Sequence, residues 1–263
     1  MTLISFSTTQ LNAFRTAFEA INSLIPDANL EFSKDGLLIR DLDKTNTILV
    51  SARFEADKFD NYSYDCPSDK YNIGVVIENL VKCIKCNLSY DVITITIEDD
   101  KDVKPKLKIV MTSKERNETK TCYPKLTNIV ANNNNIKVMN YPSKITLQPS
   151  VLNKHIKDIN HICDSVMVKL FADGLLLIGY QEDEVAMVQA LNKNNKMEII
   201  LDDDVNLDDI EKKIVVKNLM LLNRCVNLAT QVSIYIPSKK TKDPLVIEYP
   251  LASLGNMRLV YVR

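Results

Sequence analysis

The sequence is poor in the residues that build several common kinds of catalytic site. Its 263 residues include no tryptophan, only five glycines and only two histidines, His155 and His161. There is no Gly-rich phosphate loop, and neither G-x-S-x-G nor H-E-x-x-H occurs. Both histidines fall in one segment expected to be helical, which makes a poor acid–base set. These absences argue against an enzyme, including one with a site between two domains.

Long apolar runs are missing as well. A membrane-spanning helix needs about 18 or more consecutive apolar residues, and the sequence has no such stretch. The start, MTLISFSTTQ, has neither a basic segment nor a long apolar run, so we expect no signal peptide. The six cysteines are therefore expected to be reduced thiols inside a cell. Cys83 and Cys86 form a C-x-x-C within a helical pattern, and no second pair completes a zinc site, so we expect no metal.

What the sequence does contain is an internal repeat. Three pairs of motifs recur in the same order at nearly one offset, about 140 residues. They are DGLLIRDLD from Asp35 and DGLLLIGYQ from Asp173, IGVVIENLVKCI from Ile73 and IVVKNLMLLNRC from Ile214, and VITITIE from Val92 and VSIYIP from Val232. The repeat predicts two copies of one domain.

Each copy is predicted to hold two helices among many short strands. The helices are expected at 8–25 and 77–86, and again at 150–162 and 216–228. Turn residues such as Asp35-Gly36 separate the alternating strands. This pattern predicts an α+β fold whose helices cover one face of antiparallel sheets. We place the two domains at 1–125 and 142–263, joined by a polar, Asn-rich linker at 126–141.

Basic residues gather on one side of three predicted helices, and more weakly on the first. The net charge is −1, which by itself argues against a generic nucleic-acid binder, so the distribution matters more than the sum. For any single helix, a solvated charged face is the simpler interpretation. If all four helices line one surface, that surface would contact phosphates without selecting a base sequence. The positions are Arg15, Lys82, Lys85, Lys154, Lys157, His161, Lys217 and Arg224.

Further motifs run in order along the whole chain. They are Phe59-Asp60-Asn61-Tyr62, Ile73-Gly74-Val75, Lys82-Cys83, Lys85-Cys86, Asp158, His161-Ile162, Asp164, and a closing run from Pro244 to Tyr249 followed by Leu251-Ala252 and Gly255. In order and spacing they resemble the proliferating cell nuclear antigen (PCNA) family, the DNA sliding clamps of eukaryotes, archaea and some large DNA viruses. No single motif carries the resemblance.

The resemblance implies a non-enzymatic DNA polymerase processivity factor without a cofactor. Chains of this family form a head-to-tail homotrimer, a pseudo-sixfold ring of clamp domains with helices inside, around double-stranded DNA. The strands that meet between neighbouring chains of the ring would be those near 118–123 and 185–191. The ring would tether DNA polymerase, clamp loader and repair proteins, in the nucleus, or in the cytoplasm or a viral replication compartment for an archaeal or viral source. The basic positions match DNA-facing ones, although Thr16 and Asn22 stand where the family commonly has lysines.

The resemblance also implies a pocket for client proteins with a Gln-aliphatic-aromatic-aromatic motif. Ile136 and Val138 are apolar within the Asn-rich linker, which supports a pocket there, or else they pin the linker to its own domain. The pocket residues would be Leu42, Asn46, Thr47, Leu49, Ile136, Tyr141, Pro244, Val260, Tyr261 and Val262. The alternative function is a clamp-like subunit of a heterotrimeric checkpoint or viral transcription complex that forms no homotrimeric ring.

Overall fold

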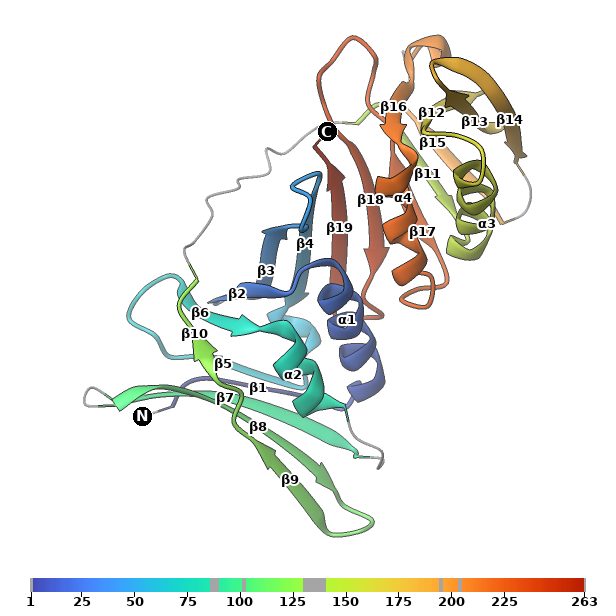
Figure 1. Cartoon of the computed structure of the whole chain (residues 1–263). Coiled ribbons are helices and arrows are strands. Elements are labelled where there is room, and N and C mark those ends of the chain that lie inside the picture. The colour runs from blue at the N-terminus through green and yellow to red at the C-terminus, as the bar shows by residue number, and fades with distance from the viewer. Residues whose placement is uncertain are drawn as a thin grey trace. The chain divides into compact units, whose positions relative to one another are not determined.

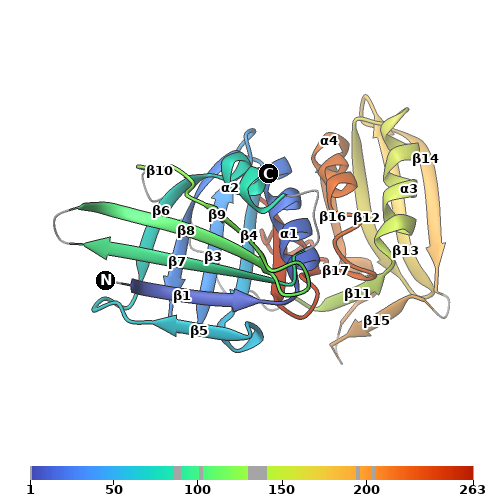
Figure 2. The same cartoon turned by 90° about the horizontal axis from the view of Figure 1, so that it is seen from below.

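The computed structural model describes residues 2–85, 90–100, 103–129, 141–193, 196–202 and 205–262. It divides the chain into two compact units (Figures 1 and 2). The first unit comprises Met1–Lys44, Val50–Asn134 and Leu251–Met257, and the second comprises Thr45–Leu49, Asn135–Pro250 and Arg258–Arg263. Each unit therefore includes a short segment from the other copy of the repeat.

The first half of the chain carries eleven described elements that recur, followed by a short strand. They are β1 (Thr2–Thr8), α1 (Leu11–Leu24), β2 (Asp27–Ser33), β3 (Gly36–Leu42), β4 (Ile48–Glu55), β5 (Asn61–Tyr64), β6 (Tyr71–Val76), α2 (Ile77–Ile84), β7 (Val92–Asp100), β8 (Val103–Ser113) and β9 (Glu118–Cys122). The short strand is β10 (Leu126–Thr127), and a single 3₁₀ turn, η1 (Ala56–Lys58), lies between β4 and β5.

The second half repeats this order. Its elements are β11 (Ser143–Leu147), α3 (Pro149–Asn160), β12 (Ser165–Phe171), β13 (Gly174–Gln181), β14 (Glu184–Asn192), β15 (Glu198–Leu201), η2 (Leu207–Asp209), β16 (Glu211–Val215), α4 (Val216–Leu219), η3 (Met220–Arg224), β17 (Val232–Tyr235), β18 (Leu245–Pro250) and β19 (Gly255–Tyr261). In both copies, a strand and a helix precede five strands, and a second helix precedes three more.

The sheets repeat as faithfully as the elements. The first copy has the strand orders β5-β1-β7-β8-β9 and β6-β2-β3-β4, and the second has β15-β11-β17-β18-β19 and β16-β12-β13-β14. Neighbours such as β1 and β7, or β11 and β17, pair antiparallel. The predicted α+β fold of two tandem copies, with few helices and antiparallel sheets, is confirmed.

The glycine after each repeated aspartate explains why the DGLL motif recurs. Gly36 opens β3 with a φ of 129°, and Gly174 opens β13 with a φ of 157°, in the region that side chains rarely adopt. A Cβ on Gly36 would lie 2.1 Å from the Phe54 carbonyl oxygen, and one on Gly174 would lie 2.0 Å from that of Leu191. The motif therefore allows the next strand's backbone to pass close to the hairpin in each copy.

The first three helices lie near their predicted positions, with shorter ends. The helix α1 begins at Leu11 rather than residue 8, because β1 continues through Thr8 and the Thr8 Oγ1 accepts a hydrogen bond from the Gln10 N–H at 3.0 Å. The helix α2 ends at Ile84, and Pro149 occupies the first turn of α3. Within the described residues, no helix is both long and apolar enough to cross a membrane.

The fourth helix was predicted wrongly as a continuous helix over 216–228. Only Val216–Leu219 is α-helical, and Met220–Arg224 forms a 3₁₀ helix. The buried side chains in this segment are Val216, Leu219, Leu222 and Cys225, which recur every third residue. Because a 3₁₀ helix has 3.0 residues per turn, this spacing keeps all four on one side, whereas an α-helix would rotate them apart.

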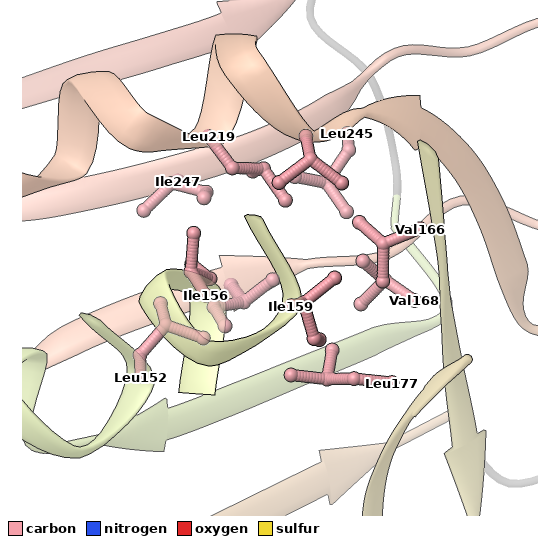
Figure 3. Close-up of a pocket in the computed structure, with 11 residues that line it drawn as sticks. Leu152, Ile156, Ile159, Val166, Val168, Leu177, Leu219, Leu245 and Ile247 are labelled. Atoms are coloured by element: carbon pink, nitrogen blue, oxygen red, sulfur yellow. The ribbon is translucent and has the colours of Figure 1, made fainter. Parts of the chain in front are cut away.

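Each unit has its own apolar core. In the first, the rings of Phe14 and Phe18 from α1 pack on Phe54 of β4, with Phe14 and Phe18 centroids 4.7 Å apart. In the second, Leu152, Ile156 and Ile159 from α3 face apolar side chains of the strands and of α4 across a cavity of about 10 Å³ (Figure 3). Such a cavity has room for at most one water, and its lining is entirely apolar, so we expect it to stay dry.

Candidate functional site

The two helices of each unit lie side by side and bury their apolar sides. In the first unit α2 contacts α1, and Leu80, Val81 and Ile84 of α2 are buried (Figure 2). In the second unit α3 contacts α4 and η3, and Leu152, Ile156 and Ile159 of α3 are buried (Figure 3), whereas Val151 is exposed. The opposite sides of these helices are consequently left to solvent in the single chain.

The sequence-predicted basic residues lie on those solvent-facing sides. Seven of the eight are exposed, namely Lys82, Lys85, Lys154, Lys157, His161, Lys217 and Arg224. Arg15 is only half-buried, and its Nε lies 4.0 Å from a carboxylate oxygen of Glu19. The predicted helix faces thus agree with the exposure of these side chains. Arg15 is the exception, because its guanidinium lies partly against the protein.

Glu78 is an acidic residue on α2 that the sequence-based prediction of a basic helix face did not include. The Lys82 Nζ lies 2.6 Å from a Glu78 carboxylate oxygen, four residues earlier on α2. The hydrogen bond from Lys82, and then its charge, lower the pKa of the Glu78 carboxyl. The spacing of four residues, with Glu before Lys, was a sequence signal for this pair. Part of the positive charge of Lys82 is therefore balanced on the same face.

The 3₁₀ segment also changes the fourth helix. Lys217 and Arg224 nearly superpose on an ideal α-helix, because seven residues make almost two full turns. The tighter 3₁₀ turns from Met220 onward rotate Arg224 further around the axis. Both side chains remain exposed, but they spread over a wider arc than predicted.

The residues of the predicted client pocket divide by burial. Leu49, Val260 and Tyr261 are buried, with exposed fractions of 5%, 2% and 2%, and so belong to the core of the single chain. Exposed surface comes from Asn46 and Val262, while four others are half-buried, namely Leu42, Thr47, Tyr141 and Pro244. Ile136 and Val138 lie outside the described residues.

Tyr141 is held by the second unit at the end of the linker segment. Its hydroxyl donates to the Pro244 carbonyl oxygen at 2.8 Å, and its ring centroid lies 5.7 Å from that of Tyr235. Burial raises the pKa of the Tyr141 hydroxyl well above its ordinary value. The Lys144 Nζ lies 5.9 Å from the centroid of the Tyr235 ring. Sequence analysis missed Tyr235 and Lys144, because only the pairing of β11 with β17 brings them beside Tyr141.

Two edge strands expose apolar side chains. The strand β9 ends one sheet of the first unit, and Tyr123, just after it, is 63% exposed. The strand β14 ends one sheet of the second unit, and Val185 and Val188 on it are 58% and 57% exposed. Free strand edges with apolar side chains are suited to pairing with another chain. These are the two strands that the sequence analysis expected to lie at the edges.

Comparison with known proteins agrees with the fold. Residues 5–135 match the sequence model described as the N-terminal domain of proliferating cell nuclear antigen. The chain is similar to the crystal structure of the proliferating cell nuclear antigen from Entamoeba histolytica, with a TM-score of 0.82 and 18% sequence identity. The superposition covers 99% of this chain and 98% of that one. At this identity the likeness concerns the fold.

Proposed function

Because this chain belongs to the proliferating cell nuclear antigen family, whose sliding-clamp fold it has, we propose that it encircles double-stranded DNA as a homotrimer. The ring acts as a non-enzymatic processivity factor that holds DNA polymerase, clamp loader and repair proteins on the duplex, in a compartment where DNA is replicated, such as the nucleus. The observation that carries this proposal is the row of exposed basic residues on the helices.

The chemistry of these residues suits a clamp that slides. Lysine and arginine contacts to phosphates attract any duplex and carry no sequence information, because they leave the base edges untouched. The eight proposed DNA-facing residues are Arg15, Lys82, Lys85, Lys154, Lys157, His161, Lys217 and Arg224. Seven of these side chains are exposed, so binding should weaken steeply as salt rises.

The duplication supports a head-to-tail assembly. By their places in the repeated sheets, β14 corresponds to β4, and β9 corresponds to β19. Within the first unit, the Glu55 N–H at the end of β4 donates to the Leu254 carbonyl just before β19 at 2.9 Å. We propose that β14 of one chain meets β9 of the next in the same manner. A head-to-tail contact closes into a ring when its rotation divides a full turn.

The partner pocket is proposed around Val262, which follows β19 and is exposed. We propose that Asn46, Thr47, Tyr141 and Pro244, which are exposed or half-buried, contribute to it, with Ile136 of the linker and Leu42 as further contributors. Leu49, Val260 and Tyr261 support this surface from beneath. A client motif with an aliphatic and two aromatic side chains would find its apolar anchor at Val262.

The experiment is retention on primed circular DNA after loading. Replacing Lys82, Lys154, Lys157 and Lys217 with Glu should reduce retention at least tenfold and leave the molecular mass by light scattering at that of a trimer. The matched control replaces Lys34, Lys58, Lys114 and Lys242, which are exposed away from the helices, and makes the same change in net charge.

Equal retention by the two quadruple variants would contradict the helix-lined surface. A wild-type protein that stays monomeric at tens of micromolar would contradict the self-sufficient homotrimer and favour a heterotrimeric clamp-like complex.

A further inference from the structure

Two cysteines far apart in sequence, Cys83 of α2 and Cys122 of β9, lie close together in the first unit. Cys83 lies in the last turn of α2, and Cys122 is the final residue of β9. The Cys122 Sγ lies 3.9 Å from the Cys83 carbonyl oxygen, and the Cys122 thiol is close enough to raise the pKa of the Cys83 thiol. Both side chains are half-buried, whereas Cys163 and Cys225 are buried. The contact is therefore within reach of small reagents in the single chain.

The backbone around this pair is favourable for a covalent bond. A disulfide requires the two sulfurs to approach to about 2.05 Å. Each cysteine stands at the end of its element: Lys85 after α2 is extended, and Tyr123 after β9 is exposed. Movement confined to these ends would leave the buried side of α2 in place.

We propose that Cys83 and Cys122 are a redox-active dithiol site, which closes to an intrachain disulfide in exchange with a small-molecule disulfide such as oxidised glutathione. One protein thiolate attacks a sulfur of the external disulfide, forming a mixed disulfide and expelling one thiolate. The second protein thiolate then attacks the protein sulfur of the mixed disulfide and expels the other thiolate. The two protein thiols are oxidised, the external disulfide is reduced to two thiols, and the two protons pass to them.

The surroundings set the order of the two steps. Burial, and then the charge and hydrogen bond of Cys122, raise the pKa of the Cys83 thiol to about 11. This makes Cys83 a poor first nucleophile near neutral pH, so the proposed order has Cys122 attack first. Once Cys122 is in a mixed disulfide, its charge and its thiol hydrogen bond no longer act on Cys83.

Lys120 assists the closing step. Its Nζ donates to the Cys83 carbonyl oxygen at 3.2 Å, and its charge lowers the pKa of the Cys83 thiol. The ammonium thus stabilises the thiolate that must attack. Lys120 acts through Cys83 and exchanges no atoms itself, so we regard it as a positioning residue.

The position of the dithiol links it to assembly, an additional consequence that rests on the proposed function. The strand β9 is one of the two free edges proposed to pair between chains. A neighbouring chain on β9 would cover Cys122 and shield the pair. Oxidation would then occur in chains whose β9 edge has no neighbouring chain, and the disulfide would link β9 covalently to α2.

The test treats the purified full chain, diluted to the monomer, with oxidised glutathione and maps its peptides without reduction. We expect a linked Cys83–Cys122 peptide and loss of two hydrogens from the intact mass. Cys83→Ser should leave a persistent glutathione adduct on Cys122, and the control Cys66→Ser should close like wild type. Closure should accelerate as pH rises from 7 to 9, because a larger fraction of the attacking thiols is ionised. Lys120→Met should slow closure several-fold at unchanged thermal stability.

Stable adducts without closure in the wild type, or a link through Cys86 instead, would overturn the proposal. The consequence for assembly has its own readout, because closure should slow as protein concentration rises and chains associate. If the disulfide forms at one rate at every concentration while light scattering shows a trimer, the dithiol stands and β9 is not the covered edge.

Discussion

At the scale of single residues, the balance between Glu78 and Lys82 sets how much charge α2 offers to DNA. Glu78→Gln should strengthen retention on DNA roughly twofold to fivefold at low salt, because it frees the Lys82 ammonium from its carboxylate partner. Glu115→Gln is the matched control, since Glu115 is equally an exposed carboxylate but lies in the turn between β8 and β9. A similar gain in both variants would mean that net charge alone matters.

Residue identity predicted some of these features and not others. The Asp-Gly pairs at 35–36 and 173–174 predicted turns, and both glycines have the positive φ that explains them. The contact between Cys83 and Cys122 could not be predicted, because it depends on which strand lies beside α2, and no local pattern specifies that. Glu182 and Asp183 also have positive φ, 49° and 65°, in a two-residue hairpin turn where glycine or asparagine is usual.

At the scale of elements, the residue that follows β19, Val262, gives the client pocket its sharpest test. Val262 is 46% exposed, and its N–H donates to the Thr47 carbonyl at 3.0 Å. Val262→Asp should weaken binding of a fluorescent peptide with the Gln-aliphatic-aromatic-aromatic motif at least tenfold, because a buried apolar anchor contributes about 2 kcal/mol. Ile200→Asp is the control, because Ile200 on β15 is 49% exposed. Unchanged affinity for Val262→Asp would move the client site elsewhere.

Helices and strands could be predicted where the apolar and polar residues alternate regularly within the segment itself. Alternating strands and the apolar sides of three helices were visible in the sequence, and the structure has them. The fourth helix was not, because the periods of 3.0 and 3.6 residues diverge by only about 60° over the first three residues, from Val216 to Leu219. The burial of Leu222 and Cys225, which continue the three-residue spacing, distinguishes the two geometries. Leu49 of the predicted pocket is likewise buried. The resemblance to the family predicted its position but not the exposure of its side chain.

At the scale of the whole molecule, buried ionisable groups should make the fold sensitive to alkali. Burial raises the pKa of the Cys225 thiol from 9.0 to about 12, and burial also raises the pKa of the nearby Tyr249. Above pH 9 the unfolded chain releases the Cys225 proton while the folded chain keeps it. The free energy of unfolding should therefore fall as pH rises from about 9 to 12, by roughly 1 kcal/mol per pH unit for each such group.

Urea unfolding at pH 8, 9, 10 and 11 measures this slope. Cys225→Ala should be less stable at pH 8, because it leaves a cavity, but its free energy of unfolding should fall less steeply above pH 9. Parallel lines for the variant and the wild type would show that Cys225 does not titrate in this range.

The exchange of segments between the two units bears on how the chain can be divided. Thr45–Leu49, from the first copy of the repeat, clusters with the second unit, and Leu251–Met257, from the second copy, clusters with the first. A protease cut within 130–140 would therefore leave two fragments that each lack a piece of their own unit and carry a piece of the other. Such fragments should stay bound to each other after the cut. Either fragment expressed by itself should fold poorly, because it lacks a segment of its own unit. We therefore expect the two copies of the repeat to fold only as parts of one chain.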